Sequence, residues 1–118
     1  MTLAFGQITF DCEDAAALAA FWSALIDQPV DDGASGFFAT VGRAAPANPW
    51  PVLMFLKVDE KKERKNRVHL DLHAEDWTAQ AERAVGLGAT HVADFDEYGT
   101  RWATLLDPEG NEFDIGAG

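Results

Sequence analysis

Three polar side chains alternate with apolar residues in one short segment of the chain. His69, Asp71 and His73 occupy every second position of residues 68–73. Successive side chains of a β-strand point to opposite faces, so these three would share a face, with neighbours about 7 Å apart. An imidazole and a carboxylate placed in this way can bind a divalent metal together. Two alternatives are that Asp71 orients the His69 ring by a hydrogen bond, and that His73 lies in solvent at the strand end.

A similar polar face is expected near the N-terminus. Gln7, Thr9 and Asp11 alternate with apolar residues in the segment 5–12, and Gln7 precedes His69 by 62 residues. The Glu-Asp pair that follows each segment recurs with the same offset. Because 62 is an even number, a strand repeated at this offset keeps the same positions on the same face. The pattern therefore predicts an internal duplication.

A helix is expected after each of these strands. Apolar residues recur there with the three- and four-residue spacing that forms one side of a helix. In the first helix they are Leu18, Phe21, Trp22, Leu25 and Ile26, and in the second they are Trp77, Ala81, Ala84 and Val85. Pro29 stops the first helix and Gly88 ends the second. We expect each helix to cover the apolar face of the strand before it.

The alternation in the second half predicts which side chains the helix covers. The covered residues of the first strand would be Val68, Leu70 and Leu72. His69 and Asp71 would then lie on the opposite face, together with Asp114, which stands between apolar neighbours on the last strand. Polar side chains on the inner face of a sheet need water, one another, a metal or a ligand as partners.

Three further strands are expected after each helix, so that each half becomes a βαβββ module. Their expected positions are around Val30, 36–41 and 51–58 in the first half, and 90–95, 100–106 and 112–115 in the second. The predicted fold is α+β, with two tandem βαβββ modules in a single domain of residues 1–118. The first module covers about residues 1–58, a solvated charged linker covers 59–66, and the second module covers about 67–118.

The charge of the chain restricts its partners. It has 20 acidic and 9 basic residues, which gives a net charge of −11. Without a basic stripe the surface repels nucleic acid and anionic membranes, and it attracts cationic ligands. An alternative reading is that the acidity only keeps the protein soluble.

The cellular setting is inferred from what the sequence lacks. Cys12 is the only cysteine, so no internal disulfide can form. No apolar run approaches the roughly 20 residues that cross a membrane, and Asp11 interrupts the N-terminal segment too early for a signal peptide. We expect a cytoplasmic protein. The sequence also lacks the glycine-rich phosphate loop and the nucleophile motif of the α/β-hydrolases.

The order of these motifs resembles that of a known superfamily. A strand, a Glu-Asp pair, a helix with Phe21-Trp22, the segment NRVHLDLHAED and the C-terminal DPEGNEFDI follow one another over nearly the whole chain. This order is similar to that of the vicinal-oxygen-chelate superfamily (glyoxalase, bleomycin resistance protein and dioxygenase), and most similar to its small glyoxalase-like branch. The resemblance implies that the two modules form an open barrel-like cup for a small-molecule ligand. It also implies that the chain can form a homodimer.

The resemblance further implies a divalent metal site in many members. The metal is held by a His or Gln on the first strand of each module and a Glu on the last. Matched by position, the ligands here are Gln7, His69 and Asp114, the last in place of the usual Glu. The fourth position falls in the segment 52–58, which offers Met54 and no carboxylate. A site of this composition suits Zn, Ni or Fe better than Ca.

Three functions stay open at this stage. A metal-dependent lyase, isomerase or dioxygenase would use Gln7, His69 and Asp114, with the metal polarising oxygens of the substrate. A metal-free protein, similar to the antibiotic-resistance members, would sequester a cationic, ring-containing drug. A binding or regulatory module would perform no reaction. The missing fourth metal ligand favours small-molecule binding without a complete metal site, and whether the protein is an enzyme is left open.

Two tryptophans are expected to contribute to the ligand site. Trp50 lies between two prolines, and Trp102 lies on the strand before the last turn. The alternative for both is packing at an interface between modules or between two copies of the chain. The side chains expected to line the cup are Asp71, Trp50, Trp102 and Met54.

Overall fold

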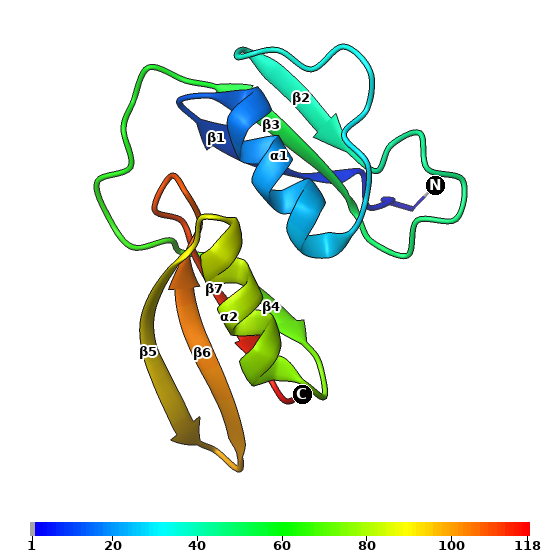
Figure 1. The fold of residues 1–118 in the computed structure, drawn as a ribbon. Coiled ribbons are helices and arrows are strands. Elements are labelled where there is room, and N and C mark those ends of the chain that lie inside the picture. Colours follow the sequence, from blue (N-terminus) through cyan, green and yellow to red (C-terminus); the bar gives the residue numbers. More distant parts are fainter. Residues whose placement is uncertain (1) are drawn as a thin grey trace. The chain divides into compact units, whose positions relative to one another are not determined.

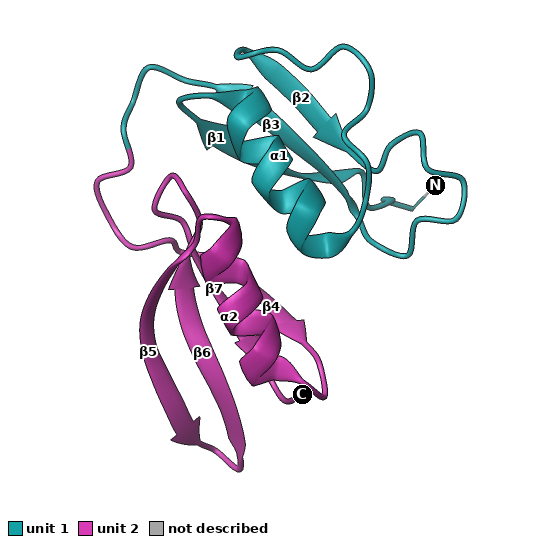
Figure 2. Ribbon diagram, viewed as in Figure 1, with its two compact units in different colours: residues 1–61 teal, residues 62–118 magenta. Residues whose placement is uncertain are grey.

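The chain folds as two units, each built from one helix and one mixed β-sheet (Figures 1 and 2). The computed structural model describes residues 2–118. Unit 1 comprises residues 1–61 and unit 2 comprises residues 62–118. Among the described residues, no helix combines the length and the hydrophobicity needed to cross a membrane.

Unit 1 follows the predicted order of elements. Its elements are β1 (Gln7–Cys12), α1 (Ala15–Ile26), β2 (Phe38–Val41) and β3 (Val52–Lys57). The sheet order is β1-β3-β2, with β1 parallel to β3 and β2 antiparallel to it. Around Val30 the predicted strand is reduced to an isolated bridge to Val41. The first strand also begins two residues later than predicted, because Phe5 and Gly6 lie outside the ladder.

Unit 2 repeats this topology with one more full strand. Its elements are β4 (Leu70–His73), α2 (Trp77–Leu87), β5 (Thr90–Glu97), β6 (Thr100–Leu106) and β7 (Glu112–Gly116). The order is β4-β7-β6-β5, with β4 parallel to β7 and the other pairs antiparallel. The predicted duplication is confirmed, since β4 and β7 correspond to β1 and β3. Within residues 2–118 both sheets are open and neither closes into a barrel.

The core of unit 1 lies between α1 and one face of its sheet. The N-cap Asp14 accepts a hydrogen bond from the Ala17 N–H, 3.2 Å, which satisfies a donor that the first helical turn leaves unpaired. On the sheet, Phe10 packs against Trp22 with ring centroids 5.3 Å apart. The predicted apolar stripe is buried throughout: Leu18, Phe21, Trp22, Leu25 and Ile26.

The core of unit 2 is thinner, because α2 presents small residues. Its fully buried side chains are alanines and the apolar residues of the two central strands: Ala81, Ala84, Ala103, Leu105, Phe113 and Ile115. Trp77 is only half-buried and Val85 is 45% exposed, although both were predicted to join the core.

The predicted burial in β4 is only partly correct. Leu70 and Leu72 are half-buried and pair in register with the buried Phe113 and Ile115. Val68 was predicted to lie under α2, but it is 80% exposed. The reason is that the β4–β7 ladder begins at Leu70, so Val68 precedes the part of the chain that is held against the sheet.

A test of this core is the substitution Leu25→Ala. It would leave a cavity under α1, and we expect it to lower the free energy of unfolding by about 2–4 kcal/mol. Urea denaturation measures this change. Val85→Ala is the matched control on the other helix and should change stability by no more than about 0.5 kcal/mol, because its side chain is 45% exposed. Equal effects of the two substitutions would contradict the packing described here.

Candidate functional site

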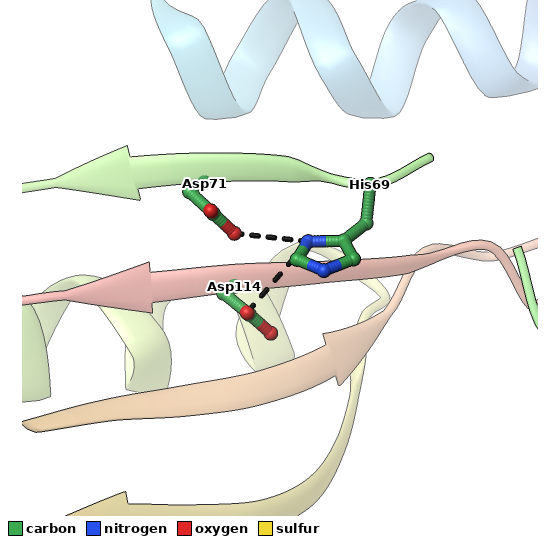
Figure 3. A group of neighbouring side chains, drawn as sticks. All are labelled: His69, Asp71 and Asp114. Carbon is green, nitrogen blue, oxygen red and sulfur yellow. Dashed lines mark ion pairs between the residues drawn. The ribbon is translucent and has the colours of Figure 1, made fainter. Parts of the chain in front are cut away.

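Two acidic side chains are placed next to each other by the parallel pairing of β4 with β7. In this register Asp71 is the partner of Asp114, and Asp114 is in turn the partner of Thr104 on β6. Both carboxylates lie on the face that is opposite to the buried apolar residues of β7, because side chains alternate along a strand. His69 precedes β4 by one residue and turns its ring towards both carboxylates (Figure 3).

The three side chains form a close cluster, which we call the His-Asp-Asp cluster (His69, Asp71 and Asp114). The Nδ1 atom of His69 lies 2.9 Å from Oδ1 of Asp71 and 3.7 Å from Oδ2 of Asp114. One ligand atom from each residue lies within 4.8 Å of the others. Among residues 2–118, the Nε2 atom of the ring has no hydrogen-bond partner. The contact of Nδ1 with Asp71 fits the alternative in which Asp71 orients the ring, and it leaves Nε2 on the other side of the ring.

The two carboxylates differ in their surroundings. The side chain of Asp71 is 59% exposed, whereas that of Asp114 is 18% exposed. Burial raises the pKa of Asp114, and the neighbouring carboxylate of Asp71 raises it further. The Thr104 hydroxyl, which donates a hydrogen bond of 2.7 Å to Asp114, and the ring of His69 oppose this shift. Asp114 is thus the member of the cluster that takes up a proton more readily than an ordinary Asp.

A group of contacts around Glu112 fixes the segment that leads into His69. Glu112 accepts a hydrogen bond from the Asn66 N–H, 3.0 Å, and forms an ion pair of 2.9 Å with Lys62. Burial alone would raise the pKa of Glu112, but the contacts with Lys62 and Asn66 outweigh it and hold that pKa below its ordinary value. Residues 59–65 of the predicted linker are exposed, and Lys62 and the half-buried Asn66 attach its second half to Glu112 on β7.

A pocket of about 420 Å³ opens on the same face of unit 2. The His-Asp-Asp cluster lines it, together with Trp102. The ring of Trp102 stacks on Phe95 with centroids 5.3 Å apart. A Cβ atom at Gly116, which lies beside Trp102 on β7, would approach the Trp102 Cβ to 2.8 Å. A residue without a side chain is therefore required at this position.

The structure distributes the predicted site residues over both units. His69, Asp71, Asp114 and Trp102 line one pocket of unit 2. Three others lie in unit 1: Gln7, Trp50 and Met54. Gln7 is exposed at the start of β1, and Trp50 is half-buried before β3.

The strand register explains why unit 1 lacks a similar cluster. Thr9 pairs with Met54 on β3, just as Asp71 pairs with Asp114 on β7. Thr9 precedes Asp71 by 62 residues, so Met54 is the counterpart of Asp114 in the duplication. The half-buried Met54 has no oxygen or nitrogen in its side chain to offer. The equivalent face of unit 1 therefore lacks the carboxylate pair.

The donor set of the His-Asp-Asp cluster is chemically suited to a divalent transition metal. It offers one imidazole and two carboxylates, which are usual ligands of Zn, Mn and Fe. Three protein ligands leave positions for water or a substrate. Alternation predicted that His69 and Asp71 could bind a metal together, and the family resemblance supplied Asp114; the association of all three in one cluster follows from the pairing of β4 with β7.

Comparisons with known proteins agree with this architecture. A family model described as a glyoxalase-like domain matches residues 7–116. A comparison with curated protein sequences gave no match. Among solved structures, a glyoxalase/bleomycin resistance protein/dioxygenase family enzyme from Burkholderia phytofirmans has 19% identity and a TM-score of 0.76, with 98% of each chain covered.

Two further solved structures contain bound ligands. The bleomycin-binding protein from Streptomyces verticillus, complexed with copper(II)-bleomycin, has 20% identity and a TM-score of 0.65, covering 100% of this chain and 99% of its own. A variant of the fosfomycin resistance protein FosX from Listeria monocytogenes, complexed with Mn(II) and a dihydroxypropylphosphonic acid, has 15% identity and a TM-score of 0.75, covering 100% and 92%. At these identities the likeness shows the fold.

The raised pKa of Asp114 predicts a pH-dependent effect of Asp114→Asn. Because the pKa of Asp114 is higher in the native state than its ordinary value of 3.8, the protonated carboxyl stabilises the native state. This stabilisation is complete below pH 3.8 and is lost as the pH rises through the native pKa. In metal-free buffer the variant should therefore gain stability relative to the wild type at pH 7 and lose that gain at pH 3. Urea denaturation at both pH values measures it.

The substitution Thr104→Val provides the complementary control. It removes the hydroxyl that lowers the pKa of Asp114, so the destabilisation of the native state between pH 3 and pH 7 should become larger than in the wild type. An Asp114→Asn effect that is the same at both pH values would contradict the raised pKa.

Proposed function

Because the chain belongs to the family of glyoxalase-like domains, we propose that it binds a small organic cation in the pocket of unit 2, without the complete metal site that the family resemblance implies. The observation that carries this proposal is the pair of neighbouring carboxylates, Asp71 and Asp114, that lines a pocket with an aromatic wall.

The chemistry of the pocket favours a positive ligand. Two carboxylates face the pocket, and the chain as a whole carries a net charge of −11, so a cation is attracted both locally and at a distance. Arg101 also lines the pocket, so the carboxylates of Asp71 and Asp114 together with this guanidinium leave an excess of negative charge there. The indole of Trp102 offers a flat apolar surface and attracts cations by its π-electrons.

The related proteins support small-molecule binding as the general function. One of them is complexed with copper(II)-bleomycin and another with Mn(II) and a phosphonic acid, so the ligands held by this fold differ widely. The choice among ligand classes therefore rests on the residues of this chain. A phosphonic acid or another anion would meet two carboxylates here, and repulsion would oppose its binding.

A second candidate function is divalent metal binding by the His-Asp-Asp cluster. The observation that favours it is the close approach of one imidazole and two carboxylates to within 4.8 Å. These three residues would hold the metal, and the metal would supply polarisation of substrate oxygens. This set differs from the family positions in using Asp71, so that Gln7 and a fourth ligand in β3 are not required.

Binding of benzyltrimethylammonium, a small aromatic cation, tests the first proposal. We expect saturable binding in isothermal titration calorimetry, and we expect Asp114→Asn or Asp71→Asn to weaken it about threefold to tenfold, with a smaller loss at high salt. Asp94→Asn makes the same charge change outside this pocket and should leave the affinity within about twofold. Stronger binding of benzenesulfonate than of the cation would overturn the proposal.

Metal content decides between the two candidates. We expect untagged purified protein to contain less than stoichiometric divalent metal in elemental analysis. If one equivalent is present, the second candidate requires that His69→Ala and Asp71→Asn remove it and that Gln7→Ala retains it, because the three ligands of unit 2 are then sufficient. Loss of the metal in Gln7→Ala would instead support the positions that the family resemblance implies.

A further inference from the structure

The loop between β5 and β6 has a backbone conformation that is unfavourable for the tyrosine at its first position. Glu97 pairs with Thr100, so Tyr98 and Gly99 form a two-residue hairpin loop. Their φ angles are +54° and +78°. Positive φ at both central residues is the signature of a type I′ turn, which matches the twist of the two strands. The first position of this turn is normally occupied by Asn, Asp or Gly.

A tyrosine at this position is expected to lower the stability of the turn. A bulky side chain in the left-handed region is a strained conformation, because the Cβ atom approaches the backbone. Burial of the ring would compensate for the strain, but Tyr98 is 94% exposed. Among the described residues there is one other non-glycine residue with positive φ, Asp27, and Asp tolerates this region well.

The position of Tyr98 at the pocket of unit 2 indicates a role in ligand binding. It lines the same pocket as the His-Asp-Asp cluster and Trp102, and it does so from the hairpin loop. Residues held in strained conformations occur at binding sites, where the surrounding structure keeps them in position for a ligand. An exposed aromatic ring at a pocket also carries apolar surface that a ligand can cover.

We infer that Tyr98 is a specificity-determining residue that contacts the ligand from the edge of the pocket. This inference rests on the proposed function and adds to it. The face of a tyrosine ring attracts a cation and packs against a planar group. With two carboxylates in the same pocket, the ligand class is a cation whose charge adjoins a ring, rather than a small hydrated cation such as ammonium.

The substitution Tyr98→Asn separates the binding role from a structural one. Asn suits the first position of a type I′ turn, so the midpoint of thermal unfolding should rise, by about 2–5 °C. The same substitution removes the ring, so the affinity for benzyltrimethylammonium should fall about threefold or more. Opposite changes in stability and affinity are not expected for a residue that serves only the turn.

Two control variants complete the experiment. Tyr98→Phe keeps the ring and should retain affinity within about twofold. Asp27→Asn changes the other left-handed residue, which does not line this pocket, and should leave affinity unchanged.

The outcomes separate the inference from the proposed function. If the wild type binds the cation and Tyr98→Asn binds it equally well, the role of Tyr98 is overturned while the proposed function stands. If the wild type does not bind the cation, the proposed function fails and the inference falls with it. Lower affinity and higher stability together support the role of Tyr98.

Discussion

The parallel pairing of β4 with β7 is the constraint on which the candidate site depends. It places Asp71 beside Asp114, and two neighbouring carboxylates on a partly buried face need a proton, a cation or hydrogen-bond donors. The structure supplies a donor from Thr104, places the ring of His69 beside the carboxylates and leaves room for a ligand in the pocket. A shift of this register by one residue would move one carboxylate to the face that α2 covers.

Much of the fold could be predicted because its signals are periodic. The spacing of residues along the chain was enough to predict the buried apolar side of α1 and the alternating faces of β1. The same spacing predicted the duplication at an offset of 62 residues. The site was predicted in part. Alternation placed His69 beside Asp71, and the family resemblance supplied His69 and Asp114, whereas the direct pairing of Asp71 with Asp114 depends on the strand register. Val68 was assigned wrongly because periodicity does not show where a ladder begins. The ion pair between Lys62 and Glu112 was not predicted, because 50 residues separate the two in the sequence.

The two units show how a duplicated module can diverge at a few positions and keep its fold. Both have a sheet whose first and last strands are parallel neighbours, and both bury one face of it with a helix. The differences lie on the other face, where Thr9 and Met54 in unit 1 stand in the places of Asp71 and Asp114. Side chains on that face are not needed for the core, so they can change chemistry without loss of stability.

The long sequence separation between β4 and β7 has a consequence for biosynthesis. Leu70 pairs with Phe113, so β4 waits for a partner that is synthesised 43 residues later. Strand pairing over such a distance is slow, and the unpaired edge of β4 stays exposed until β7 has been synthesised and has left the ribosome. The β5–β6 hairpin can close first, since its contacts are local. A nascent chain that is cut before residue 112 would therefore contain the histidine and one carboxylate, but no assembled pocket.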